Sequence, residues 1–200
     1  YWRAPSDEAT VDPRQPGEAQ GLAYPRLRDP QSARVVAEWF APRLSAWAGQ
    51  GLAGVRILCP GEAPAAFWRD LLQTVRVQAP GFLAIADTPG LAHPTVAALA
   101  QAGFDFTLSS LPWWDLGARW LAEEDAVLRA VAPPIAAVEP PGGPRTAERL
   151  SGPAHEIGLA CERHLLLAAA LGSGLLAPAD AACDDEAVRR ANALQAKVAG

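Results

Sequence analysis

Short apolar runs alternate with longer amphipathic segments from about residue 32 to the end of the chain. Five runs have the length of a strand and are apolar on both faces, which is typical of strands buried in a parallel sheet. They are "VRIL" (55–58), "FLAIAD" (82–87), "FDFTLSS" (104–110), "PIAAVE" (134–139) and "GLLAPAD" (174–180). The pattern predicts an α/β protein built from parallel βα units with right-handed crossovers.

The segments between these runs have the apolar spacing of helices. Ser32 can cap a first helix, and Pro42 should kink or interrupt it. The apolar face of this helix consists of Val36, Phe40, Leu44 and Trp47. Further helices are expected from about Ala65, over 95–103, from the cap residue Asp115 to 131, over 153–171 and over 184–199. Residues 1–31, rich in Pro, Gly and charge, predict an irregular N-terminal arm, and 32–200 form the βα module.

Two architectures fit this order of elements. One is a doubly wound open sheet, and the other is part of a (β/α)8 barrel, whose complete form needs about 250 residues. The predicted elements begin with a helix that has no strand before it, which favours a chain that starts in the middle of a barrel. Because the chain starts at Tyr1 rather than Met, we expect it to be a piece of a longer polypeptide.

Composition excludes several classes of function. The net charge is −5 and no basic cluster occurs, so we expect no nucleic-acid partner. The longest apolar stretch, "LLLAAALGSGLLAPA", is interrupted by glycines and too short to cross a bilayer. The three cysteines have no CxxC spacing, which disfavours disulfides and zinc and indicates a reducing compartment, here the cytoplasm. His155 and His164 are nine residues apart and no phosphate-binding loop occurs, so neither a metal nor a cofactor is expected.

Polar residues stand where the predicted strands end, which is where parallel α/β folds place their active sites. In chain order these positions are Leu58–Cys59, Asp87–Thr88, Ser109–Ser110, Glu139 and Asp180. Carboxylates that face one cleft can perform acid/base or glycosyl-transfer chemistry. The alternative is that they cap the helices and turns that follow.

Aromatic residues and a cysteine near the strand ends allow two interpretations each. "LPWWDL" places Trp113 and Trp114 after the third strand, either as a stacking platform for sugar rings or as a cover for the end of a barrel. Cys59 is expected to be a small buried hydrophobic residue rather than a nucleophile. The other tryptophans at helical positions, Trp39, Trp47, Trp68 and Trp120, are expected in the core.

The chain resembles the second half of the α-amylase barrel, glycoside hydrolase family 13, and within it the bacterial maltosyltransferases that extend α-1,4-glucans. "GLAGVRIL" and "PGEAPAAFW" are similar to the family's fourth strand and the Phe-Trp helix that follows it, and "FLAIADTPG" is similar to its fifth strand. "AGFDFTLSSLPWWDL" is the most specific match, and "EPPGGPR" stands where the family has "ESHDTPR". The resemblance implies strands four to eight of a (β/α)8 barrel.

The departures from the family pattern fall on its catalytic positions. The nucleophilic Asp of the family corresponds to Leu58, and the acid/base Glu corresponds to Asp87, which is one methylene shorter. The third acid corresponds to Gly142 and the His before it to Pro141. Since a retaining glycosidase needs two carboxyl groups about 5–5.5 Å apart, the resemblance implies a site that has lost its catalysis.

Three hypotheses follow. The first is a catalytically degenerate module that binds α-1,4-glucan or a maltooligosaccharide, or is structural, within carbohydrate metabolism. Its sugar-facing candidates are Arg56, Trp113, Trp114 and Asp180, with Asp87 and Glu139 as hydrogen-bond acceptors. The second is an active glycosyltransferase or glycoside hydrolase that uses Asp87 and Glu139. The third is a ligand-free structural or oligomerisation domain, because a half-barrel needs the rest of a longer polypeptide or a second copy to cover its edges.

Overall fold

The parallel sheet predicted from the sequence is present. The computed structural model describes residues 2–3, 14, 24–113, 119–139, 145–176, 189–190, 193–194 and 196–197. Its five parallel strands are β3 (Gly54–Ile57), β4 (Leu83–Ala86), β5 (Phe106–Leu108), β6 (Pro134–Ala137) and β7 (Gly174–Leu176). They stand in the sheet in chain order, β3-β4-β5-β6-β7. A doubly wound sheet reverses its strand order at a switch point, whereas a (β/α) barrel keeps chain order, so the observed order is that of a partial barrel.

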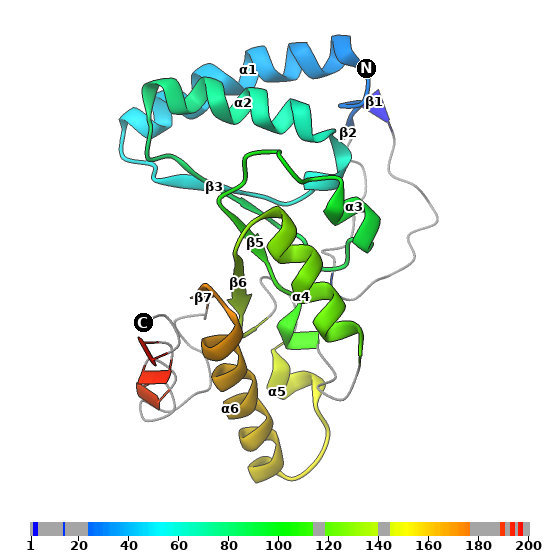
Figure 1. The fold of residues 1–200 in the computed structure, drawn as a ribbon, viewed down its shortest axis with the longest axis vertical. Coiled ribbons are helices and arrows are strands. Elements are labelled where there is room, and N and C mark those ends of the chain that lie inside the picture. The colour runs from blue at the N-terminus through cyan, green and yellow to red at the C-terminus, as the bar shows by residue number, and fades with distance from the viewer. Residues whose placement is uncertain are drawn as a thin grey trace.

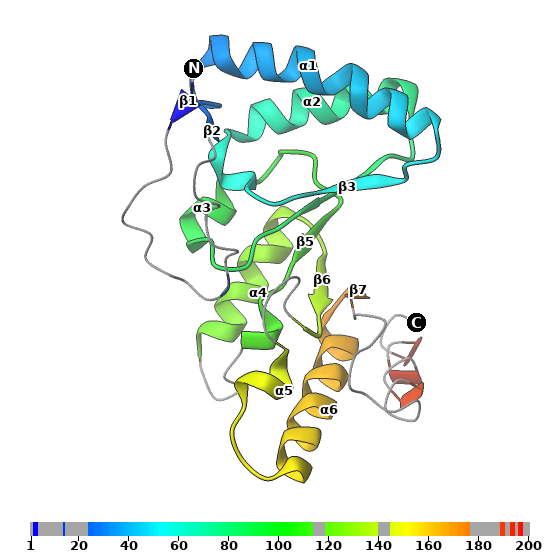
Figure 2. The same cartoon turned by 180° about the vertical axis from the view of Figure 1, so that it is seen from behind.

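The helices lie along one side of these strands. In the described residues they are α1 (Pro30–Gly49), α2 (Ala65–Gln78), α3 (His93–Ala97), α4 (Trp120–Val131), α5 (Thr146–Arg149) and α6 (Ala154–Leu171). Figure 1 shows α1 and α2 above the strands, α3 and α4 to the right and α5 and α6 below, and Figure 2 shows the same arrangement from behind. These helices leave the left-hand side of the strands in Figure 1 uncovered. A short antiparallel pair, β1 (Trp2–Arg3) and β2 (Tyr24–Pro25), precedes α1.

The start of α1 differs from the prediction. Asp29, not Ser32, is the cap: its Oδ2 accepts the Ser32 N–H at 2.8 Å, and Ser32 lies in the first turn. Hydrogen bonds from Ser32 lower the pKa of the Asp29 carboxyl. The predicted interruption at Pro42 does not occur, because α1 runs through it to Gly49. Because proline has no N–H, the Glu38 carbonyl lacks its helical donor; one residue further along, the Arg43 guanidinium donates to the Trp39 carbonyl at 2.7 Å.

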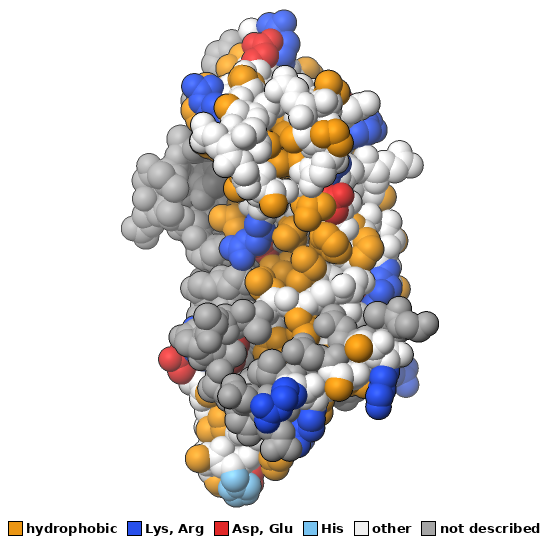
Figure 3. Space-filling model, turned by 90° about the vertical axis from the view of Figure 1, so that its left-hand side faces the viewer, with side chains coloured by type: hydrophobic (Ala, Val, Ile, Leu, Met, Phe, Trp, Pro, Cys, Tyr) orange, Lys and Arg blue, Asp and Glu red, His pale blue; other side chains and the backbone are white. Residues whose placement is uncertain are grey.

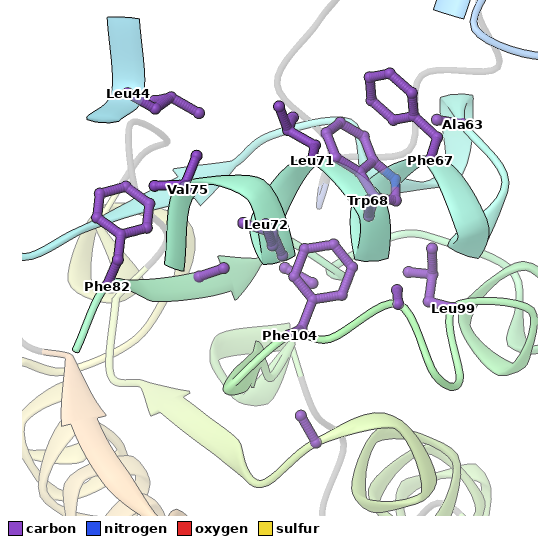
Figure 4. Packing of buried hydrophobic residues seen from close by; sticks show 14 of the residues in the cluster. Leu44, Ala63, Phe67, Trp68, Leu71, Leu72, Val75, Phe82, Leu99 and Phe104 are labelled. Carbon is purple, nitrogen blue, oxygen red and sulfur yellow. The ribbon is translucent and has the colours of Figure 1, made fainter. Parts of the chain in front are cut away.

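Alternation along the strands fixes which side chains face the helices. Val55 pairs with Ala84 and Ile57 with Ala86, and all four pack into the core beneath α1 and α2. Figure 4 shows this core, in which Leu72 of α2 points toward Phe104, and the rings of Trp68 and Phe104 lie 6.2 Å apart between centres. Successive strand residues point to opposite faces, so the residues between them face the uncovered side of the sheet. Arg56, Ile85 and Asp87 are on that side.

A second core forms between β6 and α6. Ala136 and Val138 pack against Leu165, Ala168 and Ala169 of α6, all nearly inaccessible to water. α6 matches the predicted helix over 153–171 to within one residue. The helix predicted from a cap at Asp115 begins at Trp120, with Arg119 in the cap position, and Asp115 itself lies outside the described residues.

Several burial predictions are wrong. Trp39 and Trp47 are about half exposed rather than in the core, and Cys59 is exposed rather than buried. The two tryptophans lie on α1, and Cys59 lies in the turn after β3, the strand at the edge of the sheet. Periodicity placed the two tryptophans on apolar faces but carries no information on whether another element covers those faces, and Cys59 was expected to be buried as a small hydrophobic residue. Trp68, in contrast, is buried as predicted, with its Nε1–H donating to the Pro60 carbonyl at 2.8 Å.

Candidate functional site

The carboxyl end of β3 carries an aliphatic residue in an accessible position. Leu58 follows β3 directly and is 51% exposed. The strand can lie this close to β4 because its first residue is Gly54: a Cβ there would come within 2.4 Å of the Leu83 carbonyl oxygen. After Cys59 the chain turns through the 3₁₀ helix η1 (Pro60–Glu62), which the Trp68 hydrogen bond fastens to α2. Leu58 is therefore exposed at the end of β3, just before a turn that the Trp68 hydrogen bond holds against α2.

Arg56 and Asp87 form an ion pair across β3 and β4. Arg56 Nε lies 3.5 Å from Asp87 Oδ2. The Asp87 backbone N–H donates to the Ile57 carbonyl at 2.9 Å, which continues the ladder of the two strands by one residue. The Asp87 side chain is 12% exposed, whereas that of Arg56 is 36% exposed. Burial raises the pKa of Asp87, and the positive charge of Arg56 opposes that rise.

The end of β5 places hydroxyl groups in the interior. Ser110 is fully buried and its Oγ–H donates to Glu124 Oε1 of α4. Thr88 Oγ1–H donates to the Leu108 carbonyl, which ties the turn after β4 to β5. Both hydroxyls hold the strand ends together from within rather than pointing toward a ligand. Sequence spacing indicated Ser110 as a strand-end residue but gave no sign of its partner Glu124, fourteen positions later.

Trp113 lies beside Arg149, a residue that the sequence did not single out. It ends the 3₁₀ helix η2 (Leu111–Trp113), and the Arg149 guanidinium carbon is 3.8 Å from the centre of its ring. Arg149 also donates through Nη2 to the Pro112 carbonyl at 2.8 Å. Burial lowers the pKa of Arg149, and the negative charge of Glu139 opposes that change. Trp113 is half-buried, so part of the residue stays accessible to solvent while the guanidinium lies against its ring.

Glu139 is held inside the protein by the start of α5. It is 6% exposed, and its Oε2 accepts the Thr146 backbone N–H at 2.6 Å and the Thr146 Oγ1–H at 2.8 Å. This is the geometry of a carboxylate that satisfies the amide groups of a helix start. The helix itself, α5, was not predicted because it is only four residues long.

The two carboxylates singled out in the sequence have different surroundings. Asp87 follows β4 and Glu139 follows β6, with β5 between them. Neighbouring strands lie about 4.8 Å apart, so the two backbone positions are separated by about 10 Å. One carboxylate is paired with Arg56 and the other is bound to Thr146. Trp114, Gly142 and Asp180, which complete the predicted set, lie outside the described residues.

Neither a metal site nor a membrane span emerges from the described part of the chain. No three His, Cys, Asp or Glu side chains in it gather in a way that would hold a metal ion. None of its helices combines the length and apolar character needed to cross a bilayer.

Comparison with known proteins identifies a relative. No family model matches the chain. It is 39% identical over 173 residues to the alpha-1,4-glucan:maltose-1-phosphate maltosyltransferase of Burkholderia pseudomallei (strain K96243), an alignment that covers 86% of this chain and 15% of that protein. Amy13B of Eubacterium rectale has a similar structure, with a TM-score of 0.53 and 12% identity, over 80% of this chain and 36% of that one. The relationship to maltosyltransferases expected from the sequence is thereby confirmed: the chain is homologous to part of this maltosyltransferase, and its fold matches part of Amy13B.

Proposed function

We propose that this chain is a catalytically degenerate amylase-type module that binds α-1,4-glucan without cleaving or transferring it. The observation that carries the proposal is Leu58, 51% exposed at the carboxyl end of β3, where the resemblance puts the nucleophile. A leucine side chain has no oxygen to attack an anomeric carbon, so it cannot form the covalent intermediate of a retaining mechanism.

The state of the two other carboxylates supports the loss of catalysis. Asp87 is engaged with Arg56, and its carboxyl is one methylene shorter than the glutamate of the family pattern. Glu139 accepts two hydrogen bonds from Thr146 in the interior. Residues of a catalytic set act together, so removal of the nucleophile alone takes away most of the rate.

Binding of a glucan is supported by what remains at the strand ends. The accessible part of Trp113 suits the C–H surface of a sugar ring, and Arg56 with Asp87 offers a donor and an acceptor for hydroxyl groups. The name of the Burkholderia relative gives an α-1,4-glucan as its substrate. Because this chain spans 15% of the length of that relative, glucan binding by this segment is our proposal and rests on the local site.

Calorimetric titration of the 200-residue chain with maltoheptaose tests the proposal. We expect saturable binding that is weakened at least tenfold by Trp113→Ala. The matched control is Trp39→Ala, which removes an equally large but exposed ring on α1, away from the strand ends, and should leave binding unchanged. Absence of binding by the folded parent chain, or equal binding by both variants, would contradict the proposal.

Two alternatives remain distinguishable by experiment. An active transferase or hydrolase that uses Asp87 and Glu139 would form glucans of new length from maltoheptaose, and Asp87→Asn would abolish that activity. A ligand-free structural domain would bind no glucan at all. The interior hydrogen bonds of Glu139 disfavour the first alternative, and the solvent-accessible part of Trp113 disfavours the second.

A further inference from the structure

Arg149 of α5 connects two strand ends by hydrogen bonds. Its Nη2 group donates to the Pro112 carbonyl at 2.8 Å and to Thr146 Oγ1 at 3.2 Å. Thr146 Oγ1–H donates in turn to Glu139 Oε2 at 2.8 Å. The hydrogen bonds therefore run without a break from Glu139, after β6, to the backbone next to Trp113, after β5. Figure 3 shows hydrophobic side chains gathered across the middle of the uncovered side of the strands, whereas this end of the sheet holds a polar network.

The same guanidinium lies against the Trp113 ring. Its carbon is 3.8 Å from the ring centre, within the distance of a cation–π contact. Because a guanidinium is planar and Nη2 directs both of its hydrogens at acceptors, the two hydrogen bonds fix the orientation of the plane beside the indole. A lysine could not reproduce this arrangement, since its ammonium is a single point charge on a flexible stem.

The remaining contacts of Arg149 favour a role within the protein rather than at a ligand. Its Nε is buried and has no hydrogen-bond partner among the described residues, so this nitrogen is not accessible to a sugar hydroxyl. An unsatisfied buried donor destabilises the fold, and the negative charge of Glu139 and the contact with the Trp113 ring offset that cost. Arg149 is therefore placed to act on Trp113.

The backbone that carries Trp113 is fixed by other contacts. The Trp113 N–H donates to the Ser110 carbonyl at 2.9 Å, and Leu111 is fully buried in the core between β6 and α6. The freedom that is left to Trp113 is rotation of the indole about its side-chain bonds, and Arg149 packs against that ring. A side chain that is already ordered loses less conformational entropy when a ligand binds, so a restrained indole binds more tightly than a mobile one.

We propose that Arg149 is a positioning residue for the glucan site: it holds the Trp113 indole in the orientation that stacks on a sugar ring. Glu139 supports this orientation through Thr146, which accepts from Arg149 and donates to Glu139. The inference rests on the proposed binding of glucan. It gives the carboxylate after β6 a role in ordering an aromatic surface, in place of the acid/base role that its position at a strand end suggested.

Calorimetric titration with maltoheptaose of the parent chain, Trp113→Ala, Arg149→Met and the double variant tests this proposal. Arg149→Met keeps an unbranched stem but removes the guanidinium, and it should weaken binding about fivefold because the indole must then be ordered by the ligand. If Arg149 acts through Trp113, the double variant binds no more weakly than Trp113→Ala alone. Arg149→Lys keeps the charge and should not restore the parental affinity. The matched control is Arg34→Met on α1, where a 71% exposed side chain pairs with Glu38, and it should leave binding unchanged.

Fluorine NMR of the chain labelled with 5-fluorotryptophan reports on the ring without any ligand. The chain has seven tryptophans, and the signal that is missing from Trp113→Phe identifies Trp113. We expect Arg149→Met to shift and broaden this signal and to leave that of Trp68, which is buried in the core beneath α1 and α2, unchanged. Circular dichroism establishes that each variant is folded.

The two readouts separate the failure of this inference from the failure of the proposed function. Parental affinity in folded Arg149→Met, with an unchanged Trp113 signal, would overturn the inference and leave glucan binding intact. Additive losses of affinity in the double variant would also overturn it, because Arg149 would then act on the ligand by a route other than Trp113. No binding by the folded parent chain, with a displaced Trp113 signal in Arg149→Met, would overturn the proposed function and leave Arg149 as a residue that orders the ring.

Discussion

Replacing Glu139 by alanine removes the acceptor of two buried hydrogen bonds at the start of α5. In the structure Glu139 Oε2 accepts the Thr146 N–H at 2.6 Å and the Thr146 Oγ1–H at 2.8 Å. A hydrogen bond to a charged group contributes about 1.5–3 kcal/mol, and both Thr146 donors would be left without this partner in a nearly dry site. We expect Glu139→Ala to lower the free energy of unfolding by about 3–5 kcal/mol.

Two milder substitutions define a graded series. Glu139→Gln keeps a carbonyl acceptor but removes the charge, which roughly halves the strength of each bond, so the expected loss is about 1–2 kcal/mol. Thr146→Val removes the hydroxyl donor alone and should cost about 1 kcal/mol. The control, Glu123→Gln in the exposed first turn of α4, should change stability by less than about 0.5 kcal/mol.

Urea denaturation followed by circular dichroism measures these losses. With a denaturant slope of about 2–3 kcal/mol/M, Glu139→Ala should lower the midpoint by about 1–2 M without changing the slope. A loss below about 1 kcal/mol for Glu139→Ala would refute the reasoning. It would mean that the contacts to Thr146 do not stabilise the fold and that Glu139 is available for another role.

Three further predictions concern the turn after β3, the ion pair and the cysteines. Trp68→Phe leaves the buried Pro60 carbonyl without its 2.8 Å donor and should cost about 1–3 kcal/mol in urea denaturation, because an unsatisfied buried acceptor loses its solvation. Burial raises the pKa of Asp87 in the folded chain above 3.8, so the stability that protonated Asp87 contributes is present below pH 3.8 and is lost as the pH rises through the pKa of the folded chain. Asp87→Asn does not titrate, so its free energy of unfolding should rise relative to that of the parent over that pH range. Native-state alkylation with peptide mapping should modify the exposed Cys59 before the buried Cys161, whose thiol pKa is raised by burial.

Each of these predictions has a control and an opposing outcome. For Trp68→Phe the control is Trp39→Phe on the exposed face of α1. Equal urea midpoints for the two variants would show that the hydrogen bond from Trp68 to the Pro60 carbonyl does not stabilise the turn. If the difference in the free energy of unfolding between Asp87→Asn and the parent does not change with pH, the Asp87 carboxyl has the same pKa in the folded and the unfolded chain. Alkylation of Cys161 as fast as Cys59 would show that α6 does not shield it, and unfolding in urea should equalise the two rates.

The strands could be predicted from the sequence because each is apolar on both faces and ends in a turn. β6, for example, follows from "PIAAVE" without reference to any other segment. The cap of α1 was misplaced by three residues, since Asp29 and Ser32 are both good caps and the choice depends on the direction in which the chain enters the helix.

Burial at the edge of the sheet could not be predicted from periodicity. Trp39 and Trp47 have the spacing of core residues, yet about half of each is in water because no described element covers that side of α1. The contacts at the candidate site could not be predicted from sequence spacing either. Spacing identified Asp87, Glu139 and Trp113, but the partner of Trp113 is Arg149, thirty-six residues later, and only the packing of α5 against η2 brings the two together.

The central claim is that this segment has kept the fold of an amylase-type barrel and lost its catalysis. The most direct test is mass spectrometry of maltoheptaose after prolonged incubation with the 200-residue chain, with and without maltose 1-phosphate. We predict that the ligand keeps its length under both conditions and that no glycosyl adduct forms on the protein. Shorter or longer glucans produced by the parent chain and abolished in Asp87→Asn would contradict the account and show that an active site persists without a nucleophile at Leu58.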